Sequence, residues 1–385
     1  MTDRSTAPER AAVGLARLAG MLRAEAANGL FWGAGPEEEA RLRRLRELAA
    51  ALLAEVDRRS EAEIGAIFAA DTGLRTPMPG TEFRVQCADG TRLVQRRRLR
   101  SGTLGGRIAA VAAALGAEPP ADPVAIADTD LAGLPCPHTY LLVYELTTTM
   151  DAEAAAEALL PGDPDLDGEL DYARPEASAV PVARPPLPVT EAARRILDQV
   201  AALAAASLAV ATDHYEIERQ QRIADLCADT VPAGFAYPRI DCGDLAARCV
   251  PTGADTVIFD ESDRILLIRR TDTGQWCAPG GAAEVGEPVG LAAVREAAEE
   301  TGLDVALTGL SWAFDKRDTD LGDGRMPLLL SFLARPLDPA QPIRLAELEA
   351  TDWRWTTESE AAELDLFRGH ELRVPAAYSR HRSAR

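Results

Sequence analysis

The chain has 385 residues, of which 47% are apolar and 26% are charged. This composition is typical of folded globular proteins and excludes a chain that is disordered throughout. At roughly 100–200 residues per domain, the length predicts two or three domains. The formal net charge of −20 at pH 7 repels nucleic-acid backbones and anionic membrane surfaces, so we expect neither nucleic acid nor membrane as a partner.

The sequence offers no targeting signal that we can identify. The N-terminus has no apolar stretch of the kind found in signal peptides, and no segment approaches about 18 uninterrupted apolar residues. The six cysteines form no pair at zinc-ligand spacing. We therefore expect a cytoplasmic protein with reduced thiols.

The first part of the chain, 1–160, is predicted to contain a helical hairpin followed by an α+β region of unknown function. Leucines recur at helical spacing over 9–58, with a Gly- and Pro-rich break at 28–36. The elements expected after the hairpin are a helix at 64–69, a strand–turn–strand at 83–97, a helix near 107–116 and a buried strand at 139–148.

A linker and two further segments are predicted to follow. Residues 161–190 are dense in Pro and Asp and read as a linker. Residues 191–232 have the pattern of a second helical hairpin, which Thr190 can cap. The last segment, 233–385, alternates strand and helix patterns, so we predict an α/β (α+β) protein overall. The expected strands are 255–260, 264–270, 328–336 and 352–356, and the expected helices are 358–366 and 371–383.

The two halves of the chain resemble each other weakly. Each runs from a helical hairpin to a strand–turn–strand that ends in Arg-Arg, at 96–97 and at 269–270. One interpretation is an internal duplication whose first copy has lost its chemistry. The other is a chance likeness of two amphipathic hairpins. The sequence leaves both open.

The segment GAAEVGEPVGLAAVREAAEETGL, 281–303, carries the strongest chemical signal. It fits the spacing G-x5-E-x7-R-E-U-x-E-E-x-G-U, in which U is apolar. Seven fixed positions match by chance on the order of 10⁻⁸ per start site at average residue frequencies. These positions are Gly281, Glu287, Arg295, Glu296, Glu299, Glu300 and Gly302.

The spacing predicts a helix that begins near Pro288 and ends at Gly302. At 100° per residue its three glutamates, Glu296, Glu299 and Glu300, lie within an arc of about 100°. Crowded carboxylates repel one another unless a cation lies among them, and hard oxygen ligands suit Mg²⁺ or Mn²⁺. A solvated acidic helix face is the alternative, which the registered glycines and Arg295 disfavour. On the opposite side, Leu291, Val294 and Ala298 are expected to face a core.

This pattern resembles the box of the Nudix hydrolase superfamily. TVIFDESDRILLIRR, GQWCAPGG and ELEATDWRW resemble the family's flanking elements, so the likeness covers about 250–370. The resemblance implies an α/β/α sandwich on a mixed sheet, with the box as strand–loop–helix–loop.

The resemblance also implies roles for the residues of the box. Glu299 and Glu300 would ligate Mg²⁺ or Mn²⁺, assisted by Glu287 and the Gly280 carbonyl. Glu296 would be the general base, alone or while also binding the metal. Arg295 would orient Glu296 or Glu287.

Residues outside the box are weaker candidates. Glu349 or Asp352 is a candidate for a further carboxylate. Trp276 is a candidate for base stacking or, alternatively, a core residue. Three residues expected on the loop past the box are candidates for substrate binding or ordinary surface positions: Phe314, Lys316 and Arg317.

The segment HYEIERQQRIADL, 214–226, resembles the small helical domain that precedes a subset of Nudix hydrolases acting on X-linked nucleoside diphosphates, and 15–53 is similar. The helices are candidates for a homodimer contact or for a cover over the substrate pocket. The resemblance implies a small nucleotide substrate such as ADP-ribose, a nucleotide sugar or a CDP-alcohol. The alternatives are a nucleoside triphosphate pyrophosphohydrolase and a non-catalytic sensor or interaction protein.

Overall fold

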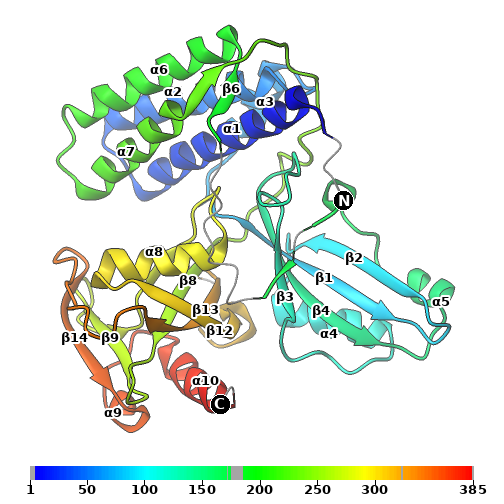
Figure 1. Cartoon of the computed structure of the whole chain (residues 1–385), viewed down its shortest axis with the longest axis vertical. Helices are drawn as coiled ribbons and strands as arrows, with labels where there is room; N and C mark the ends of the chain where they lie inside the picture. Colours follow the sequence, from blue (N-terminus) through cyan, green and yellow to red (C-terminus); the bar gives the residue numbers. More distant parts are fainter. Residues whose placement is uncertain (1–4, 171, 175–184, 322–323, 384–385) are drawn as a thin grey trace.

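The computed structural model describes residues 5–170, 172–174, 185–321 and 324–383. Part of the expected linker, 171 and 175–184, therefore lies outside the described residues. Within the described ranges no helix is long and apolar enough to cross a membrane. The chain forms three groups of elements, which Figure 1 shows as a helical group above two sheet-containing units.

The helical group combines segments from both halves of the chain. It consists of α1 (Ala7–Trp32), α2 (Pro36–Ala54), α3 (Glu61–Ala69), α6 (Glu191–Leu208) and α7 (His214–Ala228). Thr6 and Glu9 form a capping box at the start of α1, and Gly33 ends that helix with φ +86°. Leucines of α1 and α2 pack with Leu197 and Val200 of α6 in one core. The two expected hairpins are thus side by side. Short β6 (Leu187–Val189) and β7 (Thr230–Pro232) flank α6 and α7.

The first unit, which we define as residues 78–158 with the added strand β5, is a five-stranded sheet with two helices. Its strand order is β2-β1-β4-β3-β5, with β1 parallel to β4 and the other pairs antiparallel. The elements are β1 (Met78–Gln86), β2 (Arg92–Arg98), α4 (Leu104–Ala114), β3 (Ala125–Asp128), β4 (Thr139–Thr147), α5 (Ala152–Ala158) and β5 (Tyr172–Ala173). Strand β3 and helix α5 were not predicted from the sequence.

The second unit, residues 252–383, contains two sheets and three α-helices among the described residues. A four-stranded sheet has the order β11-β8-β13-β12, and a three-stranded sheet has the order β10-β9-β14. The strands are β8 (Thr252–Ile258), β9 (Ile265–Arg270), β10 (Trp276–Cys277), β11 (Gly280–Ala282), β12 (Val305–Asp315), β13 (Leu328–Pro336) and β14 (Ala350–Thr356). The helices are α8 (Val289–Thr301), α9 (Glu358–Ala362) and α10 (His370–Ser383). The mixed sheets and flanking helices confirm the α/β fold class.

The two units share one connectivity. In the first unit, β1 is antiparallel to β2 and parallel to β4, and β3 is antiparallel to β4. In the four-stranded sheet of the second unit, β8 is antiparallel to β11 and parallel to β13, and β12 is antiparallel to β13. The resulting orders, β2-β1-β4-β3 and β11-β8-β13-β12, therefore correspond strand by strand. Helix α4 lies between the second and third of these strands in the chain, as α8 does in the second unit. This correspondence pairs β2 with β11, so the Arg-Arg likeness between 96–97 of β2 and 269–270 of β9 is not part of it.

The two units also share a core. One continuous hydrophobic cluster contains Phe83 and Tyr144 of the first unit together with Ile258 and Phe332 of the second. Within it the Tyr140 and Thr252 hydroxyl oxygens lie 3.1 Å apart and share a hydrogen bond between β4 and β8. Burial of this apolar surface couples the two sheets in folding.

Candidate active site

The box forms strand β11, a loop and helix α8, and Gly302 ends the helix with φ +70°. The face of α8 that meets the sheet was predicted only in part: Val294 packs against the shared core. Leu291, Val294 and Ala298 are only partly buried, whereas a different set is buried: Val289, Ala292, Ala293 and Ala297. The prediction looked for large apolar side chains and so passed over the alanines. Their small side chains allow α8 to pack close to the sheet.

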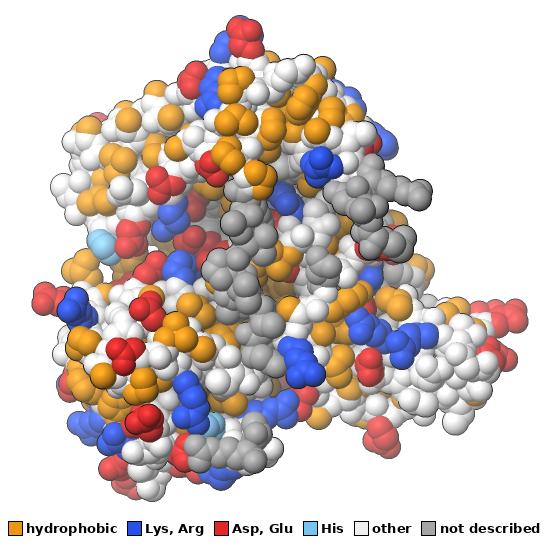
Figure 2. Space-filling view, in the orientation of Figure 1, with side chains coloured by type: hydrophobic (Ala, Val, Ile, Leu, Met, Phe, Trp, Pro, Cys, Tyr) orange, Lys and Arg blue, Asp and Glu red, His pale blue; other side chains and the backbone are white. Residues whose placement is uncertain are grey.

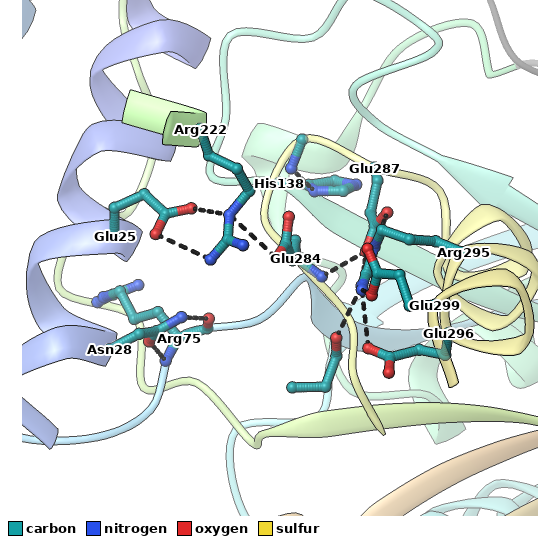
Figure 3. Close-up of polar contacts among 12 residues, drawn as sticks. Glu25, Asn28, Arg75, His138, Arg222, Glu284, Glu287, Arg295, Glu296 and Glu299 are labelled. Carbon is teal, nitrogen blue, oxygen red and sulfur yellow. Dashed lines mark hydrogen bonds and ion pairs between the residues drawn. The ribbon is translucent and has the colours of Figure 1, made fainter. Parts of the chain in front are cut away.

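The guanidinium of Arg295 lies among the carboxylates of the box (Figure 3). Its Nη2 is 2.7 Å from Glu287 Oε1, and its Nη1 is 2.9 Å from both Glu296 Oε1 and Glu299 Oε2. Its Nη2 also donates to the Ala282 carbonyl at 3.2 Å. These contacts fix the three carboxylates relative to β11, because a guanidinium donates in several directions of one plane.

Two glycines of β11 allow the carboxylates to lie against the strand. A Cβ on Gly281 would lie 2.6 Å from a carboxylate oxygen of Glu296. The Gly280 N–H donates to Glu300 Oε2 at 2.8 Å, and a Cβ on Gly280 would meet the backbone of Asp255. A side chain at either position would collide with these neighbours, so both positions require glycine.

Burial changes the acidity of the box. It raises the pKa of Glu296 to about 7, and the charge of Glu299 acts in the same direction. The pKa of Glu300, which is 7% exposed, is also raised well above its usual value by burial and by Glu296. The Glu299 side chain is 52% exposed. Both carboxyls are thus harder to ionise than an exposed glutamate unless a cation stabilises their charge.

The donor set of the box fits a hard divalent cation. Its oxygen ligands are carboxylates and a backbone carbonyl, and the burial of Glu296 and Glu300 would be offset by a positive charge. In the structure Arg295 supplies positive charge to this cluster. Among the described residues no group of three or more His, Cys, Asp and Glu side chains is arranged to hold a metal ion.

The structure places the candidate substrate-binding residues outside the box. Trp276 is 7% exposed and packs in the core of the three-stranded sheet, with Arg354 over its ring. Phe314 is a buried residue of β12 rather than of a loop, so that expectation was wrong. It pairs with Leu329, which pairs with Gly253 beside Ala282 of the box. Three strand spacings separate Phe314 from Ala282, about 14 Å.

Lys316 and Arg317 lie in a 3₁₀ helix directly after β12, not in an open loop. Arg317 forms a bidentate ion pair with Asp315 at 2.7–2.8 Å. Burial lowers the pKa of Lys316. The neighbouring Asp315 and Asp318 face the first unit, where they accept hydrogen bonds from the start of α4.

Of the two candidates for a further carboxylate, Glu349 lies nearer the box. Its charge contributes to the raised pKa of Glu300, and its Oε1 accepts a hydrogen bond from the Tyr215 hydroxyl of α7 at 3.0 Å. Asp352 instead lies in β14, opposite Arg269.

Several residues at the site were not identified from the sequence. Arg222 of α7 lies between Glu25 of α1 and Glu284 of the box loop, with Nε 3.1 Å and 3.2 Å from their Oε1 atoms. Burial raises the pKa of Glu284 to about 7. His138, from the first unit, accepts the Gly286 N–H at its Nδ1 at 2.9 Å (Figure 3). The spacing of the box gives no signal for these partners, since they lie far away in the chain.

The surface is hollowed between the helical group and the second unit. Figure 2 shows this hollow on the left of the molecule, with acidic and basic side chains around it. Contacts close it at two places: Tyr215 reaches Glu349, and the ring of Trp32 is covered by Arg325, whose guanidinium carbon is 4.7 Å from the ring centroid. The box loop meets the helical group through the ion pair of Glu284 with Arg222.

Comparison with known proteins identifies the class of the second unit. Residues 250–376 match the model of the NUDIX domain family, so the chain contains a Nudix domain. A putative 8-oxo-dGTP diphosphatase of Bacillus subtilis (strain 168) is 46% identical over 56 residues, which are 14% of this chain and 38% of that protein. A MutT-like protein of Streptomyces ambofaciens is 31% identical over 107 residues, 28% of this chain and 64% of that protein.

The chain thus spans less than two thirds of the length of these relatives. Among solved structures, a UDP-X diphosphatase is similar with a TM-score of 0.41 and 18% identity, covering 50% of this chain and 94% of that one.

Proposed function

We propose that this chain is a divalent-metal-dependent Nudix hydrolase that cleaves the diphosphate bond of a nucleoside diphosphate linked to another moiety. One observation carries the proposal. The complete set of box glutamates is gathered on one side of α8, around Arg295 and against the two glycines of β11. A protein that only senses a ligand does not need this costly concentration of buried carboxylates.

The roles of the residues follow from their surroundings. Glu296 is the general base, since a carboxyl with a pKa of about 7 is matched to accepting a proton from water at neutral pH. Arg295 is a positioning residue that holds Glu296 and Glu287 at fixed distances from β11. Glu299, Glu300, Glu287 and the Gly280 carbonyl would hold the Mg²⁺ or Mn²⁺ ion. When bound, the ion makes water more acidic and offsets charge on the phosphate oxygens.

The substrate class is proposed from the hollow beside the box. Helices α1 and α7 bound this space, and they contribute aromatic and charged side chains: Trp32, Tyr215 and Arg222. A substrate with groups on both sides of its diphosphate can contact the box and the helices together. This arrangement suits ADP-ribose, a nucleotide sugar or a CDP-alcohol. A UDP-X diphosphatase is among the similar structures.

A second candidate is a nucleoside triphosphate pyrophosphohydrolase. The observation in its favour is the relative named as a putative 8-oxo-dGTP diphosphatase, which is 46% identical over 56 residues. The same box chemistry serves both reactions. The two candidate substrates differ in the group attached to the nucleoside diphosphate, which is another moiety in the first and a third phosphate in the second.

The experiment is a turnover screen of the purified full chain with Mg²⁺ and with Mn²⁺. The substrates are ADP-ribose, CDP-choline, UDP-glucose, 8-oxo-dGTP and the unmodified dNTPs. We expect the X-linked nucleoside diphosphates to be cleaved fastest, yielding a nucleoside monophosphate. Glu299→Gln and Glu300→Gln should each lower kcat by about 100-fold or more, because each removes a proposed metal ligand.

Glu261→Gln is the matched control. Glu261 is an exposed glutamate in the turn between β8 and β9, so its variant should keep wild-type turnover. Preferred cleavage of 8-oxo-dGTP would favour the second candidate. Absence of turnover on every substrate, or full turnover in both box variants, would refute the hydrolase proposal.

A further inference from the structure

The first unit repeats the connectivity of the Nudix domain but contains no box. The order and directions of its strands β1 to β4 match those of the four-stranded sheet of the second unit, whose three-stranded sheet has no counterpart among the described strands of the first, and α4 occupies the place of α8. Yet Leu104–Ala114, the sequence of α4, contains no Asp or Glu. Metal-dependent chemistry of the kind proposed for α8 is therefore absent from the corresponding helix.

This unit nevertheless reaches the box. His138, directly before β4, is buried between Asp128 of β3 and the loop that precedes α8. Its Nε2 is 2.9 Å from Asp128 Oδ2, and its Nδ1 is 2.9 Å from the Gly286 nitrogen. Because the Gly286 N–H must donate, Nδ1 is the acceptor and the ring proton lies on Nε2, directed at Asp128.

The orientation of the imidazole is fixed in turn. Oδ1 of Asp128 accepts hydrogen bonds from the Asp130 and Leu131 nitrogens at 2.8 and 3.2 Å. A carboxylate held by its own turn presents its second oxygen in one direction. The first unit thus offers a rigid acceptor to the box loop.

The backbone of the box loop at Gly286 is constrained on its other side by α1 as well. Gly286 has φ +101°, and a Cβ there would lie 2.3 Å from the sulfur of Met21 in α1. The next residue is Glu287, which accepts hydrogen bonds from Arg295 and from the Glu284 nitrogen. A displacement of Gly286 would therefore pass directly to Glu287 and to the carboxylates that Arg295 holds.

We infer that the first unit is a second copy of the Nudix fold without a box, retained as a built-in partner whose His138 positions the box loop through Gly286. His138 is a positioning residue, because it contacts the loop and none of the proposed metal ligands. The part of this inference that concerns activity rests on the proposed hydrolase function. The positioning itself is a property of the free protein.

The test compares two substitutions of His138, each of which keeps only one of its two hydrogen bonds: the one with Gly286 or the one with Asp128. In His138→Asn the amide oxygen takes nearly the place of Nδ1 and accepts the Gly286 N–H. In His138→Gln the amide takes the place of Nε2 and reaches Asp128 without serving Gly286. Amide hydrogen exchange over 283–290 is measured by mass spectrometry on the full chain without substrate.

We expect His138→Gln to accelerate exchange of this segment by about three- to tenfold, the range that corresponds to one net hydrogen bond, whereas His138→Asn stays near wild type. Asp122→Asn removes another contact between the units, the exposed ion pair with Arg380, and should leave exchange of the segment unchanged. With Mg²⁺ and the best substrate of the screen, kcat of His138→Gln should fall while KM changes little.

Unchanged exchange in His138→Gln would overturn the inference. Equal acceleration in both His138 variants would overturn it as well, since a merely stabilising histidine predicts that result. If no substrate of the screen is cleaved, the hydrolase proposal fails, but the exchange measurement still decides whether His138 holds the loop.

Discussion

At the scale of single residues, the site is defined by carboxyl groups that burial makes hard to ionise. Glu296 and Glu284 each have a pKa raised to about 7, with burial as the largest cause, and that of Glu300 is also raised. The fold therefore favours their neutral forms. Burial acts to lower the pKa of Arg295, but its hydrogen bonds and ion pairs with Glu287 and Glu296 outweigh burial and raise that pKa, so the guanidinium stays charged. This balance predicts how stability depends on pH and metal.

We predict that the metal-free protein loses stability between pH 5 and pH 8. The pKa of Glu296 is 4.5 when exposed and about 7 in the fold. Its stabilising contribution is thus complete below about pH 4.5 and is lost as pH rises through 7. One such group accounts for up to about 3 kcal/mol. Thermal unfolding in EDTA should show a smaller decline in Glu296→Gln than in wild type.

Mg²⁺ should stabilise the wild type more at pH 8 than at pH 5, because deprotonated carboxylates bind the ion. Glu261→Gln should follow the wild type at both pH values. An equally steep decline in Glu296→Gln would show that another group causes the pH dependence.

At the scale of elements, strand β11 and helix α8 together position the proposed site residues. The close approach of Glu296 to Gly281 brings the proposed base against the strand that carries the Gly280 carbonyl. Strand β11 pairs with β8 at Asp255, whose carboxylate forms a buried ion pair with Arg373 of α10. Strand β11 is thus held by β8, which the ion pair between Asp255 and Arg373 connects to α10.

We predict that Gly281→Ala lowers kcat by about 10- to 100-fold, because the added methyl group displaces the Glu296 carboxylate, and small displacements of reacting groups have effects of this size. The melting temperature should change by only a few degrees, since a flexible side-chain end can move aside. Gly309→Ala is the control, because its Cβ meets no atom within 4 Å. Wild-type kcat in Gly281→Ala would refute a positioned Glu296.

Elements were predictable where their pattern is local and regular. The hairpin of β1 and β2 agrees with the expected strand–turn–strand, since an Asp-Gly turn joins two alternating runs. Strand β12 was missed because two register shifts, between Leu307 and Gly309 and between Leu310 and Trp312, interrupt its alternation. Strand β3 is only four residues long, too short to give a period.

At the scale of the whole molecule, the chain combines a helical group with two sheet-containing units. The two hairpins join in one helical group, and the two sheets share one hydrophobic cluster. The box loop is contacted from α1, from α7 and from the first unit. The Nudix domain is therefore built into a larger structure that covers its apolar surface.

We predict that residues 233–385 alone, cut at the boundary expected from the sequence, are less stable than the full chain. The cut exposes the side of the shared cluster that Phe83 and Tyr144 cover, and each fully buried large apolar side chain contributes about 1.5–3 kcal/mol. The fragment should melt at lower temperature and bind a hydrophobic dye. A fragment with the melting temperature of the full chain would show that the shared cluster contributes little.

The sequence by itself determined the candidate residues of the box and the end of its helix at Gly302. The reason is that the ligand candidates, from Gly280 to Glu300, lie within 20 positions of one another, on a strand, loop and helix whose geometry is fixed by short-range bonding. It also determined the helical hairpins, whose leucine spacing is local. The tertiary structure alone decided what faces the box. His138, Arg222 and Met21 reach it from distant parts of the chain, and such contacts depend on how sheets and helices pack.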